Sequence, residues 1–233
     1  MPERMLCAIP ARGGSKRLPR KNIRTLAGKP MIAHTIEIAR QSGLFDTVYV
    51  CTDDLEIADV AIAHGAAVPF LMPPDLCGDL VASHAPCQRL AAHLAENGAP
   101  TDTLVCLQPT SPLRTVDDLQ SAVIKFQTNS FDFVVSVTPV DPHYFHWVVA
   151  PKKGDDFWGM YFGSQFLKER PLLPPVFRPN GSIKIGRLPV LAQVGHFFGE
   201  RLGVVETPED HSVHVAVEFD LKLCEMILAE RAA

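Results

Sequence analysis

Residues 5–23 read Met-Leu-Cys-Ala-Ile-Pro-Ala-Arg-Gly-Gly-Ser-Lys-Arg-Leu-Pro-Arg-Lys-Asn-Ile, an apolar run followed at once by a loop rich in glycine and cations. The apolar residues Leu6–Ala11 predict a first β-strand. Gly13 and Gly14 allow backbone N–H groups to approach a ligand closely, and the arginine and lysine side chains supply positive charge. A strand that ends in such a loop indicates a polyphosphate site more strongly than a solvated basic loop.

The loop matches neither of the two common phosphate-binding fingerprints. The sequence contains no G-x-x-x-x-G-K-[ST], and no G-x-G-x-x-G follows the first strand. These absences disfavour a P-loop ATPase and a dinucleotide-binding Rossmann domain.

Composition narrows the class of protein further. The chain has 233 residues, a net charge of −4 and a pI near 6.1, which argues against nucleic-acid binding. It has no apolar run of about 18 residues, and Met1–Arg4 do not lead into the hydrophobic region of a signal peptide, so we expect no membrane span and a cytoplasmic protein. Six cysteines occur without a C-x-x-C pair or zinc spacing, which favours free buried thiols.

Strand-like apolar runs alternate with helical patterns, which is typical of a parallel sheet flanked by helices. The expected strands are Leu6–Ala11, Thr47–Thr52, Ala67–Leu71, Thr103–Leu107 and Phe133–Val137. The expected helices are Met31–Ser42, Leu55–His64, Ser83–Glu96 and Val116–Gln127. Regular structure is expected again at Ser182–Ile185, Leu202–Val205 and Ser212–Val217, before a last helix, Glu218–Glu230. We therefore expect one α/β domain over residues 1–233.

Residues 140–178 interrupt this alternation with an accumulation of prolines and aromatic residues. The apolar content is too high for a solvated linker. The segment is either a flap over the site or an arm that buries its aromatic side chains against a second subunit.

Three strings resemble the acylneuraminate (sialic acid) and related nonulosonate cytidylyltransferases. The opening loop is similar to that family's A-R-x-x-S-K-x-x-x-x-K-N through Ala11, Arg12, Ser15, Lys16, Lys21 and Asn22. The others are Leu107–Arg114, Leu-Gln-Pro-Thr-Ser-Pro-Leu-Arg, and Phe177–Gly181, Phe-Arg-Pro-Asn-Gly. The resemblance runs from about residue 6 to residue 228. It implies a Rossmann-like nucleotidyltransferase (GT-A-like) fold whose inserted arm serves dimerisation, and we favour the arm over the flap and expect a homodimer.

The resemblance also implies roles for individual residues. Arg12 and Lys21 would contact the phosphates as catalytic residues, and the nucleotide would be bound by Ala11, Arg12, Gly13, Gly14, Ser15, Lys16, Lys21, Asn22, Asp79 and Ser83. The acceptor would be bound by Gln108, Arg178, Asn180 and Lys184. Arg178 suits a sugar carboxylate because a guanidinium binds a carboxylate through two parallel hydrogen bonds.

The sequence departs from the family at the expected magnesium site. Where the family's closing motif carries two aspartates that hold Mg²⁺, this chain has His214 and Ala216. Alanine cannot bind a metal, and Mg²⁺ prefers oxygen ligands to imidazole. Three possibilities follow. CTP phosphates and water hold the ion, or another carboxylate such as Asp220, Glu218 or Asp79 replaces the two aspartates, or turnover is weakened. The His214 side chain could contact phosphate, act as a base or serve only in packing, and His214 and Asp220 are the candidate metal ligands.

The function that the resemblance implies is transfer of CMP from CTP to an acidic acceptor, with release of pyrophosphate. We expect a nonulosonic acid, such as a sialic, legionaminic or pseudaminic acid, as the acceptor and Mg²⁺ as the cofactor. The alternatives are a phosphonate or 3-deoxy-ulosonate acceptor, or a nucleotide-binding protein with weakened catalysis.

Overall fold

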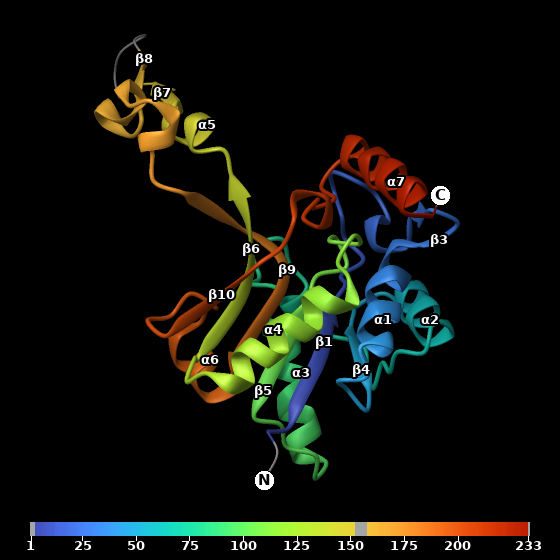
Figure 1. Cartoon of the computed structure of the whole chain (residues 1–233). Helices are drawn as coiled ribbons and strands as arrows, with labels where there is room; N and C mark the ends of the chain where they lie inside the picture. The colour runs from blue at the N-terminus through green and yellow to red at the C-terminus, as the bar shows by residue number, and fades with distance from the viewer. Residues whose placement is uncertain (1–2, 152–157, 233) are drawn as a thin grey trace.

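The centre of the computed structural model, which describes residues 3–151 and 158–232, is a six-stranded sheet (Figure 1). Its order is β10-β6-β9-β5-β1-β4. β9 is antiparallel to both of its neighbours, whereas the other neighbouring pairs are parallel, which confirms the mostly parallel α/β sheet. The strands are β1 (Met5–Pro10), β4 (Val48–Cys51), β5 (Thr103–Leu107), β6 (Phe133–Val140), β9 (Val176–Arg187) and β10 (Leu202–Glu206).

Helices cover both faces of this sheet. α1 (Met31–Gln41), α2 (Leu55–Ala63) and α4 (Val116–Thr128) pack on one face, and α3 (Ala85–Glu96) and α6 (Leu188–Val194) pack on the other. Alternate residues of β1 contribute to the two cores, since Cys7 and Ile9 join the first and Leu6 and Ala8 the second. Burial on both faces explains why the strands are continuous apolar runs in the sequence.

Local capping explains where the helices begin. The Asp54 side chain accepts hydrogen bonds from the backbone N–H groups of Glu56 (2.9 Å) and Ile57 (3.1 Å), which fixes the start of α2. Thr115 and Asp118 form a reciprocal capping box at the start of α4. The expected helices are confirmed to within about two residues at each end. Among the residues described, no helix combines the length and the apolar character needed to cross a membrane.

Two expected strands are wrong. Residues 67–71 form only an isolated bridge between Ala67 and Tyr49, because Pro69 lacks the N–H that a strand would need. Residues 212–217 are irregular and lie between the 3-10 turn η5 (Glu209–His211) and α7 (Glu218–Ala232). The N–H of Val215 donates to Thr110 O in the loop after β5 (2.8 Å), so this segment pairs with a loop and not with the sheet.

Residues 141–151 and 158–175 project from the ends of β6 and β9, away from the body of the protein (Figure 1). The described part contains α5 (Pro142–His146), the paired strands β7 (Val149–Pro151) and β8 (Trp158–Met160), and two 3-10 turns, η3 (Gly163–Leu167) and η4 (Arg170–Leu172). Residues 152–157 of the segment lie outside the described residues. Phe145 stacks on Phe162 at 4.4 Å, whereas Tyr144, Trp158 and Tyr161 are exposed.

Candidate active site

The loop after β1 is shaped by contacts with the loop after β4. The N–H of Gly13 donates to the Asp53 carboxylate at 2.8 Å. A Cβ at Gly13 would lie 2.6 Å from Asp54 Oδ2, so any other residue would force the Asp54 side chain to shift, whereas a Cβ at Gly14 would meet open space. The amide of Asn22 donates to Arg12 O (3.0 Å), which ties the two ends of the loop together.

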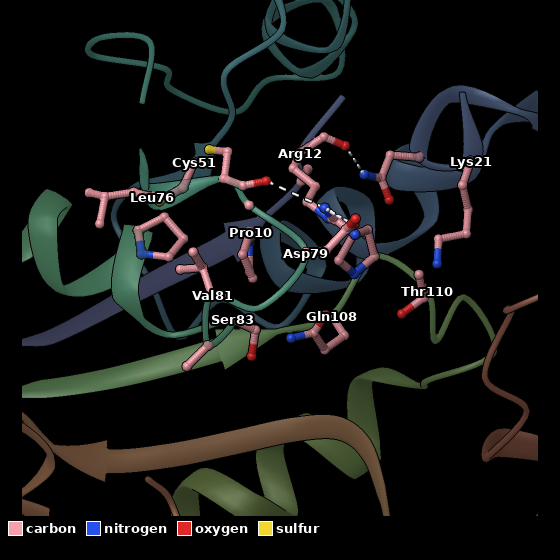
Figure 2. Close-up of a pocket in the computed structure, with 17 residues that line it drawn as sticks. Pro10, Arg12, Lys21, Cys51, Leu76, Asp79, Val81, Ser83, Gln108 and Thr110 are labelled. Atoms are coloured by element: carbon pink, nitrogen blue, oxygen red, sulfur yellow. Dashed lines mark hydrogen bonds and ion pairs between the residues drawn. The ribbon is translucent and has the colours of Figure 1, made fainter. Parts of the chain in front are cut away.

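This loop forms one wall of a cavity of about 220 Å³ (Figure 2). Ala11, Arg12, Lys21 and Asn22 line that wall. The second wall is the segment from Leu76 to Ser83 with Pro86, and the third is Gln108–Thr110 directly after β5. The structure therefore brings the loops after β1 and β5 into one crevice at the carboxyl ends of parallel strands, where open α/β sheets bind their ligands.

Arg12 and Lys16 share one carboxylate. Asp79 Oδ1 lies 2.6 Å from Arg12 Nη1, and Asp79 Oδ2 lies 2.6 Å from Lys16 Nζ. Hydrogen bonds from Lys16 and Arg12 lower the pKa of Asp79, so this carboxyl group is ionised at neutral pH. Arg12 also donates to Cys77 O at 3.4 Å. The expected nucleotide-binding residues Asp79 and Arg12 are thus in direct contact with each other.

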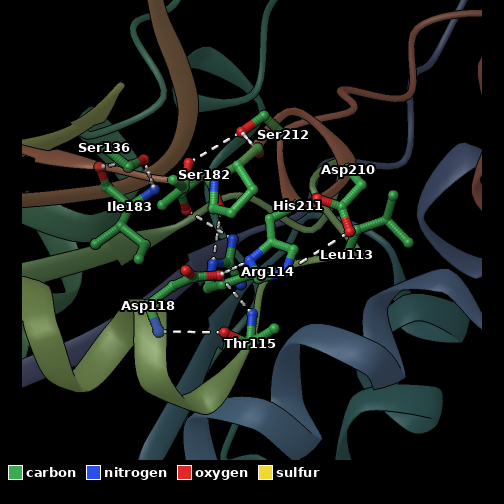
Figure 3. Close-up of polar contacts among 12 residues, drawn as sticks. Leu113, Arg114, Thr115, Asp118, Ser136, Ser182, Ile183, Asp210, His211 and Ser212 are labelled. Carbon is green, nitrogen blue, oxygen red and sulfur yellow. Dashed lines mark hydrogen bonds and ion pairs between the residues drawn. The ribbon is translucent and has the colours of Figure 1, made fainter. Parts of the chain in front are cut away.

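The Gln108 loop is held by a buried cation, Arg114 (Figure 3). Its guanidinium donates to Gln108 O (3.0 Å), to Ser182 O (2.6 Å) and to Ser182 Oγ (2.9 Å). Burial lowers the pKa of Arg114 to about 10, which still leaves it charged at neutral pH. Arg114 therefore clamps the loop after β5 to β9. This role was not predicted from the sequence, although Arg114 is the last residue of the Leu107–Arg114 string.

The expected acceptor residues on β9 do not line this cavity. Arg178 is exposed, and Lys184 is half-buried with its Nζ 5.9 Å from the centre of the Phe197 ring. The Asn180 side chain is buried and accepts from Ser136 Oγ (2.6 Å).

The remaining bonds of the Asn180 side chain give it a structural role instead of the expected substrate contact. Its oxygen also accepts from the Ser182 N–H, and its amide donates to Thr207 and Ser212. These four bonds stabilise a bulge at which the register between β6 and β9 shifts, and Gly181 adopts a φ of 75° there.

The segment expected to hold a metal lies beside the cavity but does not fit one. His214 Nδ1 is 3.2 Å from Thr110 Oγ1. Crowding by protein atoms, together with Lys21 and Lys184, lowers the pKa of His214 to about 4, although its side chain is partly open to solvent.

Asp220, the other candidate ligand, caps α7. Its Oδ2 accepts from the N–H groups of Ala216 (2.8 Å) and Val217 (3.0 Å). Among residues 3–151 and 158–232, no three His, Cys, Asp or Glu side chains gather as metal ligands would. The donor set, one imidazole and one capping carboxylate among cations, does not match the oxygen ligands that Mg²⁺ prefers, so His214 and Asp220 are not supported as its ligands.

Comparisons with known proteins agree with this geometry. The profile of the family described as "Cytidylyltransferase" matches residues 6–146. "Pseudaminic acid cytidylyltransferase" of Campylobacter jejuni is 44% identical over 133 residues, a match that spans only 57% of each chain. "CMP-N,N'-diacetyllegionaminic acid synthase" of Legionella pneumophila is 35% identical over 202 residues, 84% of each chain.

The fold is shared with a solved nucleotide complex. The structure of "CMP:2-keto-3-deoxy-manno-octonic acid synthetase complexed with CTP" superposes with a TM-score of 0.73, covering 98% of this chain and all of the other at 17% identity. That likeness shows the fold alone, whereas the profile match and the relatives show the lineage. The chain belongs to the cytidylyltransferase family, in the group that includes the pseudaminic, legionaminic and acylneuraminate enzymes.

Proposed function

We propose that this protein transfers CMP from CTP to a nonulosonic acid and releases pyrophosphate. The observation that carries the proposal is the cavity in which the cationic loop after β1 faces Gln108–Thr110 after β5. The names of the relatives support the same reaction, because they describe CMP transfer to pseudaminic and legionaminic acids.

The reaction needs charge neutralisation more than covalent chemistry from the protein. A hydroxyl oxygen of the acceptor forms a bond to the α-phosphorus as the bond to the bridging oxygen of the β-phosphate breaks, and the hydroxyl proton passes to solvent. Arg12 and Lys21 line the cavity and Lys16 reaches its edge through Asp79, so these three cations would stabilise the negative charge on the phosphates. Gln108 lies on the opposite wall, where it would contact the acceptor.

Lys184 and Arg178 remain our proposed partners for the acidic group of the acceptor. Both lie on β9, the strand that pairs with β5 just before Gln108. No ion pair of either side chain occurs with any part of the chain that the structure describes, so both are available to bind an anion.

Because His214 and Asp220 do not suit Mg²⁺, the ion needs other ligands. We propose that Mg²⁺ enters as part of the CTP substrate, bound by phosphate oxygens and water, as this ion commonly is.

The arm and the cysteines support two further assignments. We propose a homodimer that buries the exposed aromatic side chains of residues 141–175, which include Tyr144, Trp147 and Tyr161. We also propose a cytoplasmic location, because all six cysteines are free thiols and such thiols persist in a reducing compartment.

The direct test is pyrophosphate release from CTP with a panel of acceptors: pseudaminic, legionaminic and N-acetylneuraminic acids, a 3-deoxy-ulosonate and a phosphonate. We expect release with at least one nonulosonic acid and none without acceptor. Arg12→Ala should abolish release, whereas Arg20→Ala removes the same charge from an exposed position of the loop and should retain it. Release with the phosphonate alone would reject the proposed acceptor class.

A second candidate function is nucleotide binding with weakened catalysis. The observation that favours it is the presence of His214 and Ala216 where the family resemblance implies two carboxylates. Tight CTP binding without pyrophosphate release from any acceptor would support this candidate and reject the first.

A further inference from the structure

A carboxylate of the protein itself, Asp79, occupies the phosphate-binding side of the cavity. The two oxygens of the Asp79 carboxylate contact two different cations, each at 2.6 Å. These cations, Arg12 and Lys16, are the ones that the proposed function assigns to the phosphates. A phosphate group that used both of them would need the space and the hydrogen bonds that Asp79 now occupies.

The segment that carries Asp79 can move at little cost. Gly78, Asp79 and Leu80 are all exposed, and Leu80 buries none of its side chain. Residues 77–84 form neither helix nor strand, and α3 begins only at Ala85. The contacts that hold Asp79 over the cavity are therefore mainly its two ion pairs, which are partly open to solvent and correspondingly weak.

We propose that Asp79 is a displaceable internal counter-ion: its carboxylate pairs with Arg12 and Lys16 in the free protein, and the phosphates of the nucleotide replace it. This inference rests on the proposed function, since it takes the phosphate-binding role of the two cations from there. It gives Asp79 a role opposite to the nucleotide contact that the sequence suggested. Asp79 lowers the affinity of the protein for every ligand whose phosphates need both cations. When pyrophosphate leaves, the Asp79 carboxylate pairs with Arg12 and Lys16 again.

Mass action determines which ligands bind more weakly because of the Asp79 ion pairs. If the paired state of Asp79 must open before phosphate binds, the apparent dissociation constant is the intrinsic constant divided by the fraction of open protein. CTP and pyrophosphate need the cations and are weakened by the same factor. Cytidine has no phosphate and is not weakened. Two partly exposed ion pairs correspond to a factor of about three to ten.

The test measures binding of CTP, pyrophosphate and cytidine to the full chain by calorimetry, for the wild type and for Asp79→Asn. The substitution keeps the shape of the side chain and removes its charge. We expect the dissociation constants of CTP and pyrophosphate to fall about three- to tenfold and that of cytidine to stay the same. Asp75→Asn is the matched control, because Asp75 is an exposed aspartate four residues earlier in the chain and does not line the cavity, and it should change none of the three.

The outcomes separate this inference from the proposed function. Unchanged or weaker pyrophosphate binding in Asp79→Asn, or an equal gain in Asp75→Asn, overturns the counter-ion role. Weaker cytidine binding in Asp79→Asn also overturns it and restores Asp79 as a nucleotide contact. If neither the wild type nor either variant binds CTP, the proposed function fails. The pyrophosphate measurement still decides whether Asp79 competes for the two cations.

Discussion

Replacement of Arg114 by methionine should destabilise the fold more than any surface change near the cavity. The guanidinium is 3% exposed and satisfies three acceptors at 2.6–3.0 Å: both oxygens of Ser182 and the carbonyl of Gln108. Methionine fills a similar volume but donates no hydrogen bond, so three charge-assisted bonds are lost. Ser182 Oγ is then left without a donor, whereas Ser182 O and Gln108 O keep only the longer bonds from the N–H groups of Gln108 (3.4 Å) and Ser111 (3.3 Å). At about 1 kcal/mol for each lost bond to a charged donor, we expect a loss of about 3 kcal/mol in the free energy of unfolding.

Urea denaturation of wild type, Arg114→Met and Arg114→Lys at pH 7.5 measures this loss directly. Lysine keeps the charge but lacks the planar fork, so it should recover only part of the stability. The looser Gln108 loop should also raise the KM for the acceptor more than it weakens CTP binding. A loss below about 1 kcal/mol for Arg114→Met would refute the reasoning, because water or a rearranged loop would then have replaced the three bonds of the guanidinium.

Three further changes test other parts of the structure. Gly13→Ala places a Cβ against the Asp54 side chain, which caps α2, so it should lower the free energy of unfolding by about 1 kcal/mol and weaken CTP binding. Gly14→Ala should do neither, and thermal unfolding and calorimetry measure the two effects. Trp147→Ser should shift the mass measured by light scattering from dimer to monomer, and an unchanged dimer would exclude this face of the arm. The pKa of His214 in the folded protein lies below that of an unfolded histidine, so the unfolded state takes up the proton first as the pH falls. The free energy of unfolding should therefore decrease as the pH drops from 6.5 towards 4. Urea titrations should find a smaller decrease in His214→Asn.

Local signals in the sequence were sufficient for the elements that begin the fold. The apolar run at β1 and the first residues of α2 and α4 depend on neighbours within four residues, and the structure confirms all three. The expected strand at residues 212–217 depended on alternation alone. Alternation cannot reveal that Thr110, about a hundred residues earlier, supplies the partner for Val215.

The candidate site shows the same division. The cationic loop could be identified because its glycines, cations and asparagine lie close together in the sequence, and Arg12, Lys21 and Asn22 of this loop line one wall of the cavity. The clamp by Arg114 could not be identified, because its partner Ser182 arrives on β9, 68 residues later. Asn180 illustrates the limit of motif matching: its string was recognised, but the four partners of its side chain are visible only once β6, β9 and η5 are packed together.

The distribution of carboxylates around the cavity determines how this protein must handle the charge of a triphosphate. Asp53 accepts the N–H of Gly13, Asp79 pairs with two cations and Asp220 caps α7, so each of these carboxylates already has a partner. Neutralisation of the phosphates then depends on Arg12, Lys16 and Lys21, of which Lys16 is largely exposed. Interactions of exposed charges are screened by salt. A cavity built in this way should therefore bind CTP with an affinity that falls markedly as ionic strength rises, whereas its affinity for cytidine should be almost independent of salt.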